Sequence, residues 1–325
     1  MSINRLVEPL THYLTDSVNE IMINKPQEVW VESGGVTKKI MDENLTFDAL
    51  YGIAMQIANH SKQELSEKNP ILSAALPSGE RVQILIPNAL EQGRIAFAIR
   101  KPNPLSLSLS DMESAGSFSK TTVTQVGISD TDKKLSELLK NGDTKAFLAL
   151  AVQSQKNIII SGGTSSGKTT FANALVKHIP LDERIITIED TREAELPHEN
   201  KLHLLGSSGN QGVSEVTFND LLRACLRLNP TRILMSELRG SEAFDFLRAV
   251  NSGHPGAITT MHADSPKGAV FQLTLMVLQA GLTLTQEQIR NYILSIVDVI
   301  VQCKNVNGKR IVTEIFYEPQ RKSFE

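Results

Sequence analysis

The chain of 325 residues has 41% hydrophobic and 21% charged residues, the balance of an ordinary globular protein with about two domains. A formal net charge of -3 excludes a strong general attraction to nucleic acid, so we expect direct nucleic-acid binding to be weak. The two cysteines, Cys225 and Cys303, exclude a disulfide framework and a four-cysteine zinc site, and are typical of buried thiols in a reducing cytoplasm.

The N-terminal hundred residues show a mixed α+β pattern. They begin without the basic start, apolar stretch and cleavage site of a secretory signal, and no run of about 18 apolar residues occurs in the chain, so we expect any membrane association to be peripheral. Two short apolar runs on either side of a turn-like segment predict a hairpin over 20–32. Helical spacing predicts a helix over 45–60, and strands are predicted at 81–86 and 94–100.

The last of these strands alternates in polarity. Its large apolar side chains face one way, while Arg94 and Arg100 face the other. The small Ala96 and Ala98 are expected to leave the arginine face open, and Arg81 begins the preceding strand. These features predict a basic surface able to grip polyphosphate, with surface arginines of no special role as the alternative.

A serine- and threonine-rich stretch at 104–132 has little apolar periodicity and is predicted to link two domains. We therefore assign residues 1–103 to an α+β N-terminal domain and residues 133–325 to a C-terminal domain. In the C-terminal domain a helix is predicted over 135–152 and a strand over 157–161, and further apolar strands then alternate with amphipathic segments. This alternation predicts an α/β domain with a parallel sheet covered by helices.

A glycine-rich loop after that strand carries the strongest functional signal. It satisfies the nucleoside-triphosphate loop pattern in full, with the residues Gly162, Gly163, Thr164, Ser165, Ser166, Gly167, Lys168 and Thr169. Its backbone N–H groups and the following helix N-terminus are expected to hold phosphates. Lys168 is expected to reach the β- and γ-phosphates and Thr169 to bind Mg²⁺, while Thr170 contacts the α-phosphate or only occupies the first helical turn. The alternative is a structural glycine-rich turn.

Hydrolysis also needs carboxylates, and two apolar strands, 184–190 and 232–237, end in acids. In an open parallel sheet the carboxyl ends of such strands meet beside the phosphate loop. We assign Glu237 as the catalytic carboxylate that positions or activates water, and Glu189 as an acid oriented toward Mg²⁺ or water, with Asp190 as its close second. The alternative for each acid is a solvated strand end.

Histidines and arginines supply further candidates. His262 follows a short strand and is predicted to sense the γ-phosphate, with His254 as a weaker candidate for the same role. Arg223 and Arg227 share one face of a helix predicted over Thr217 to Asn229, where they point to a subunit interface or form ordinary salt bridges. Arg239 is placed to stabilise phosphates or a neighbouring carboxylate.

The order of the motifs GGTSSGKT, TIEDTREAEL, ILMSELRG and GHPGAITTMHA resembles that of the secretion traffic ATPases, which have a phosphate loop, an acidic box, a second-strand glutamate and a histidine box. The segments EIMINKPQEVWVE and RIAFAIRKP also resemble the N-terminal domain of the type IV secretion and conjugation branch. The type II secretion branch usually carries a cysteine-rich zinc module, which two cysteines cannot build. The pilus-retraction branch ends in a basic helical segment that the C-terminus here does not resemble.

This resemblance implies a RecA-like ATPase domain in a homo-hexameric ring, located peripherally on the cytoplasmic face of the bacterial inner membrane. It further implies partners among other ATPases and inner-membrane channel components, and Mg²⁺-dependent hydrolysis of ATP that drives transport or pilus assembly. By motif position, Lys168 and Thr169 bind nucleotide and Mg²⁺. Glu189 belongs to the acidic box, Glu237 is the catalytic glutamate and His262 belongs to the histidine box. Arg94 and Arg100 are expected to reach the phosphates. Thr231 departs from the acid that relatives often carry after the proline.

Other functions stay open at this point. A nucleotide-gated assembly switch would keep Lys168 and Thr169 but would not need Glu237, and a small-molecule kinase would need a lid that the sequence does not suggest. A type II secretion or pilus motor is the alternative within the family. The sequence leaves open the transported substrate, protein or DNA, the parent system, the adenine contacts, the turnover rate, and the way the linker connects domains of neighbouring subunits.

Overall fold

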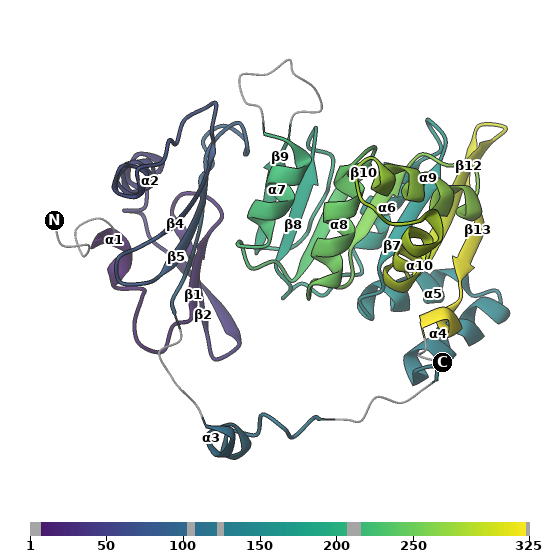
Figure 1. Cartoon of the computed structure of the whole chain (residues 1–325), viewed down its shortest axis with the longest axis horizontal. Helices are drawn as coiled ribbons and strands as arrows, with labels where there is room; N and C mark the ends of the chain where they lie inside the picture. Colours follow the sequence, from purple (N-terminus) through teal and green to yellow (C-terminus); the bar gives the residue numbers. More distant parts are fainter. Residues whose placement is uncertain (1–7, 103–107, 122–126, 207–215, 323–325) are drawn as a thin grey trace.

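The computed structural model describes residues 8–102, 108–121, 127–206 and 216–322, and it contains two sheets that lie side by side (Figure 1). The first sheet is built from the N-terminal hundred residues, and the second from residues 158 to 317. Residues 108–121 of the linker lie below both sheets in this view (Figure 1). No helix among the described residues is both long enough and apolar enough to cross a membrane.

The first sheet is antiparallel, with strand order β3-β2-β1-β6-β5-β4. Its strands are β1 (Glu20–Ile23), β2 (Glu28–Ser33), β3 (Val36–Met41), β4 (Ile71–Ala75), β5 (Arg81–Leu85) and β6 (Ala96–Arg100), and its helices are α1 (Glu8–Thr11) and α2 (Phe47–Ser61). The predicted hairpin, helix and strands are confirmed. α2 begins where the Thr46 hydroxyl accepts a hydrogen bond from the Ala49 N–H, and it ends at Lys62, which has left-handed backbone angles.

The inner strands β1, β5 and β6 of this sheet are buried on both faces. On one face Ile95, Phe97 and Ile99 pack against α2 in an apolar core. On the opposite face Ala96 and Ala98 are also buried, at 0% and 2% exposure, because they pack into the core of the second sheet. The expectation that these alanines leave an open basic surface is therefore wrong, since small side chains here permit close packing between the two sheets.

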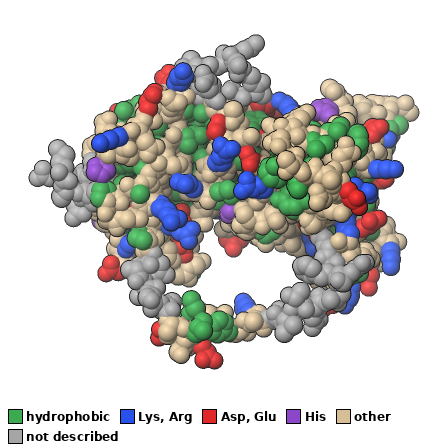
Figure 2. Space-filling view, in the orientation of Figure 1, with side chains coloured by type: hydrophobic (Ala, Val, Ile, Leu, Met, Phe, Trp, Pro, Cys, Tyr) green, Lys and Arg blue, Asp and Glu red, His purple; other side chains and the backbone are tan. Residues whose placement is uncertain are grey.

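The linker contains a short helix, α3 (Leu109–Ser114), that begins with a capping box between Ser108 and Asp111. None of its residues is buried, and its hydrophobic side chains are visible at the surface (Figure 2). The helix predicted over 135–152 is two helices, α4 (Asp130–Lys140) and α5 (Thr144–Gln153). The prediction of one helix is wrong because Gly142 adopts φ +75° and Asp143 caps the start of α5. The domain boundaries stay a prediction.

The second sheet has strand order β13-β12-β7-β11-β10-β8-β9, in which every neighbouring pair is parallel except β12 and β13. Its strands are β7 (Ile158–Gly162), β8 (Ile185–Glu189), β9 (Lys201–Leu205), β10 (Arg232–Leu238), β11 (Ile258–Met261), β12 (Val299–Val306) and β13 (Lys309–Tyr317). Burial on both faces explains their continuous apolar runs: Ile158 and Ile160 enter one core and Ile159 the other. The predicted α/β architecture is confirmed.

Helices cover both faces of this sheet (Figure 1). They include α5, given above, and α6 (Lys168–Val176), α7 (Phe218–Cys225), α8 (Glu242–Asn251), α9 (Pro266–Leu278) and α10 (Gln286–Ile296), and the 3-10 helix η2 (Pro319–Lys322) follows. α7 has the predicted Thr217 capping box but ends at Cys225, so its predicted extension to Asn229 is wrong; Asn229 has a positive φ of 53°. Cys225 and Cys303 are buried free thiols, as expected.

Candidate functional site

The parallel strands bring the predicted site residues to one edge of the second sheet. β7, β11, β10 and β8 are adjacent in that order, so their carboxyl ends meet. Gly162 ends β7, His262 follows β11, Glu237 lies near the end of β10 and Glu189 ends β8. The predicted convergence of the strand ends is therefore observed.

The glycine-rich loop leaves the start of α6 free to receive an anion. Gly167 is the residue before α6, has φ +90° and offers no side-chain cap to the first helical N–H groups. The Ser166 hydroxyl is buried and has no hydrogen-bond partner, and a Cβ on Gly162 would lie 2.5 Å from it. Uncapped N–H groups at a helix start and an unpaired hydroxyl in a tight loop are the features expected of a phosphate cradle.

Lys168 lies over this loop. Its ammonium group donates to the carbonyl oxygens of Gly162 and Gly163, at 3.0 and 3.1 Å. Partial burial lowers the pKa of Lys168, and the negative charge of Glu237 opposes that shift. The lysine thus lies within the field of the predicted catalytic carboxylate. Thr169 and Thr170 follow in the first turn of α6, and both are exposed.

Glu237 lies at the centre of a polar group formed by several loops. Its Oε2 accepts from the Arg239 Nε at 2.7 Å, and Arg239 also donates to Asp190 at 2.8 Å. The His262 Nε2 lies 2.9 Å from the Glu237 Oε1, which is buried and has no hydrogen-bond partner. A carboxylate with one oxygen fixed by Arg239 and the other without a hydrogen-bond donor keeps one acceptor for a water molecule.

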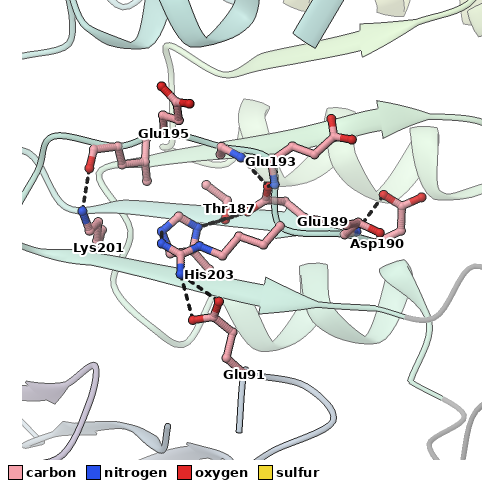
Figure 3. A network of polar contacts seen from close by, with 12 residues as sticks. Glu91, Thr187, Glu189, Asp190, Glu193, Glu195, Lys201 and His203 are labelled. Atoms are coloured by element: carbon pink, nitrogen blue, oxygen red, sulfur yellow. Dashed lines mark hydrogen bonds and ion pairs between the residues drawn. The ribbon is translucent and has the colours of Figure 1, made fainter. Parts of the chain in front are cut away.

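Glu189 has a different environment. It is 1% exposed, and its Oε1 accepts the backbone N–H groups of Glu193 and Ala194, each at 2.8 Å. Its Oε2 accepts from the Thr187 hydroxyl at 2.5 Å and lies 3.1 Å from the His203 Nδ1 (Figure 3). Burial alone would raise the pKa of Glu189, but these hydrogen bonds outweigh it and lower the pKa to about 2.

Two pockets adjoin these groups. A pocket of about 730 Å³ lies beside the glycine-rich loop and is lined by Gly163, Thr164, Ser166, His262, Asp264 and Phe271, among others. A smaller one, of about 50 Å³, is lined by both Thr169 and Glu189. Thr169 and Glu189, the two residues predicted to serve Mg²⁺, therefore face a common space.

The N-terminal arginines are not brought to the loop. Arg94 lies 3.9 Å from Glu91 and shares a small pocket with Arg192 and His203. Arg100 ends β6 near Glu20, whose pKa is raised to about 7 by burial against the opposing charges of Arg100 and Arg184. No contact described for either arginine reaches residues 162–170. His254 lies before β11, at the opposite edge of the sheet, where its Nδ1 is 2.9 Å from the Pro230 carbonyl oxygen.

Sequence reasoning missed four side chains around this edge: Thr187, Arg192, His203 and Arg310. Arg310, on the β12–β13 hairpin, packs so closely over Gly167 that a Cβ there would lie 2.8 Å from its Cδ. Arg192 lies within the acidic segment TIEDTREAEL, so the sequence did carry a local signal that could have pointed to it. His203 and Arg310 belong to segments that carry no motif.

Comparisons with known proteins agree with one another. The model of the family Type II/IV secretion system protein matches residues 5–322. The type IV secretion system protein VirB11 of Bartonella quintana is 45% identical, over 96% of this chain and 92% of its own length. PtlH, a type IV secretion system protein of Bordetella pertussis, is 39% identical over 92% of this chain and 90% of its own length. The crystal structure of the VirB11 ATPase from the Brucella suis type IV secretion system, in complex with sulphate, is 40% identical, covers 99% of each chain and has a TM-score of 0.92.

Proposed function

We propose that loop 162–170 and Glu237 form the hydrolytic site of this chain, which is a type IV secretion ATPase. The chain belongs to the type II/IV secretion system protein family, and over its whole length it resembles VirB11 proteins. The observation that supports this assignment is the Glu237 Oε1, a buried acceptor without a hydrogen-bond donor, whose carboxylate acts on the charge of Lys168 at an uncapped helix start. A nucleotide whose phosphates occupy the loop would direct its γ-phosphate toward this oxygen.

The roles of the remaining side chains follow from their positions. Lys168 exchanges its two loop carbonyl partners for phosphate oxygens, because charge-assisted bonds to phosphate are stronger than bonds to neutral carbonyls. Glu237 orients the attacking water through Oε1 and takes up its proton, while Arg239 fixes Oε2. His262 lies against Glu237 and is exposed on its other side, so it is placed to respond to the γ-phosphate.

The residues present also fit Mg²⁺. The Thr169 hydroxyl is exposed at the start of α6, and the Glu189 carboxylate shares a pocket with it. Since all four hydrogen bonds of Glu189 come from the protein, we propose that Thr169 is the direct ligand and that Glu189 acts from a fixed position through water. Bound Mg²⁺ would neutralise charge that develops on the β- and γ-phosphates.

We further propose that six copies form a ring that lies peripherally on the cytoplasmic face of the inner membrane, beside channel components and other ATPases of the secretion system. The relatives named above, which are proteins of such systems, support the proposal. In a ring, Arg94 and Arg100 are proposed to reach the nucleotide of a neighbouring copy, because in their own chain they contact other groups. An arginine supplied by a neighbour changes phosphoryl transfer rates by about 10³ to 10⁵.

The test measures ATP turnover and particle mass together, across a range of protein concentrations, for the natural chain and for Glu237→Gln. We expect turnover to rise as hexamers form, and Glu237→Gln to lose at least about 100-fold in kcat while still binding nucleotide. Glu137→Gln, on the exposed surface of α4, is the matched control and should keep its turnover. A monomer in which Glu237→Gln hydrolyses normally would overturn the ring and the catalytic assignment, leaving a nucleotide-gated switch.

A further inference from the structure

Four side chains connect the nucleotide edge of the second sheet to the first sheet. The connection begins at Glu189 and continues through His203, whose Nδ1 faces the buried carboxylate at 3.1 Å. The other ring nitrogen, Nε2, lies 3.4 Å from a terminal nitrogen of Arg192. Arg192 then donates to both carboxylate oxygens of Glu91, at 2.8 and 2.9 Å.

This geometry determines how His203 is protonated at its two nitrogens. A guanidinium group can only donate, so Nε2 must accept from Arg192 and carry no proton. The ring proton therefore lies on Nδ1, where it is donated toward Glu189 or Thr187. Because His203 is buried, at 9% exposure, and Glu189 is at 1%, small shifts of the histidine ring pass directly to the carboxylate.

The far end of the connection belongs to the first sheet. Glu91 lies in the loop between β5 and β6, and this loop is seated on the edge of the second sheet. Ala89 and Leu90 are buried in the second sheet's core, and the Ala89 carbonyl accepts from the Leu205 N–H of β9 at 2.8 Å. Figure 3 shows Glu91 reaching up from this loop toward β9, with His203 and Glu189 beyond it.

We propose that Glu91 and Arg192 are positioning residues for ATP hydrolysis, which act through His203 to hold the Glu189 carboxylate in its working orientation. The loop that contains Glu91 thereby makes the geometry of the site depend on the seating of the first sheet. This inference rests on the proposed role of Glu189. It concerns a step at the site and not nucleotide capture, because none of the three supporting side chains lines the pocket beside the phosphate loop.

The test compares kcat and KM for MgATP in the full chain and in Glu91→Gln, Arg192→Gln and the double variant. Each single variant should lower kcat about 10-fold, because slight misplacement of a catalytic group costs up to about 100-fold, while KM stays within about twofold. The double variant should be no slower than the singles, since either change already breaks the same connection. Affinity for a fluorescent ATP analogue should not change.

Glu199→Gln is the matched control. Glu199 forms an exposed ion pair of 3.5 Å with Lys39 across the same two sheets, but it does not touch His203 or Glu189. Its kcat should stay within about twofold of the natural chain. Equal losses in Glu199→Gln and Glu91→Gln would show that the effect is general loosening of the two sheets, and would overturn the proposal.

Arg192→Lys provides a second route if the glutamine variants fold poorly. Lysine keeps the positive charge but has no fork that donates to Glu91 and His203 together, so kcat should still fall. A natural level of kcat in Arg192→Lys, or a double variant about 100-fold slower than the natural chain, contradicts the proposal. Absence of turnover in the natural chain would instead contradict the function proposed for the whole site.

Discussion

At the scale of single residues, the site pairs two carboxylates with opposite surroundings. Glu237 has one oxygen without a hydrogen-bond donor, whereas Glu189 is enclosed by two backbone N–H groups, a hydroxyl and an imidazole. The first arrangement leaves a group available for water, and the second fixes a permanent negative charge. This division explains how one strand-end acid can act on a substrate while another organises the edge.

The ionised state of Glu189 predicts a dependence of stability on pH. The folded-state pKa is about 2, below the ordinary value of 4.5, so the stabilisation is present above pH 4.5 and is lost as the pH falls toward 2. The natural chain and Glu189→Gln differ in their free energy of unfolding, and this difference should therefore shrink by about 2 kcal/mol as the pH falls from 5 to 3. Urea titrations at both pH values measure the gap. A gap that does not narrow would contradict a depressed pKa.

The contact between Gly167 and Arg310 predicts the effect of an added methyl group. Gly167→Ala should cost about 1 to 2 kcal/mol of stability, because φ is +90° and the new Cβ would meet the Arg310 side chain at 2.8 Å. Gly163→Ala is the control, since nothing lies within 4 Å of a Cβ there. Urea unfolding compares the two variants, and equal stabilities would rule out this strain.

Part of the site was predictable from the sequence because its signals are local. The loop at 162–169 is one continuous motif, and Glu237 ends an apolar strand, so both could be placed before the structure was known. His203 could not, because its partners Glu189 and Arg192 come from a neighbouring strand and the loop after it. The role of Glu189 toward Mg²⁺ stays a prediction.

At the scale of helices and strands, a buried ion pair joins three elements. Arg232 begins β10 and is 0% exposed, and its Nη2 donates to Glu183, just before β8, at 2.7 Å. It also donates to the carbonyl oxygen of Val152 in α5 at 2.6 Å. The strand that carries Glu237 is therefore anchored at its start, far from the chemistry at its end.

Removing one partner of this pair predicts a large loss of stability. Glu183→Gln should cost about 3 kcal/mol, because it leaves the Arg232 charge buried without a counter-charge. Lys133→Gln, which breaks an exposed pair of 2.8 Å with Asp130 on α4, should cost far less stability, because water screens an exposed pair. Chemical denaturation of both variants measures the two losses in free energy of unfolding. Comparable losses would mean that burial does not make the Arg232–Glu183 pair more important for stability.

Elements were easiest to predict where the chain gave clear start or stop signals. The strand at 157–161 and the cap at Thr217 are examples, since flanking residues and side-chain hydrogen bonds define them locally. The division between α4 and α5 was missed because the apolar spacing continues through Gly142. The end of α7 was missed because the chain continues past Cys225 as a tighter turn, in which the N–H groups of Arg227 and Leu228 bond to the carbonyl oxygens three residues back.

At the scale of the whole molecule, the two sheets share apolar and polar contacts. The Arg184 guanidinium donates to the Asn24 Oδ1 at 2.8 Å, and the Asn24 amide donates to Asn200 at 3.0 Å, all in buried positions. Ala96 and Ala98 also pack in the core of the second sheet. Sequence alone could not reveal this interface, because a strand with alternating alanines has the same sequence pattern whether the alanines are buried or exposed.

A charged side chain in this interface is expected to separate the two sheets. Ala98→Glu places a carboxylate where the exposed fraction is 2%, with no partner, at a cost of several kcal/mol. Calorimetry should then show two unfolding transitions where the natural chain shows one. Lys38→Glu, on the exposed strand β3, should keep a single transition. One cooperative transition in Ala98→Glu would mean that the sheets do not depend on this contact.

The bond from the Leu205 N–H to the Ala89 carbonyl has a further consequence for self-association. β9 is the last strand of its sheet, and the outer side of such a strand offers unpaired backbone groups to any passing chain. The loop before β6 occupies part of that side. The loop before β6 thus covers part of the exposed edge of β9. Molecules that lack this cover would be expected to aggregate by pairing of their β9 strands.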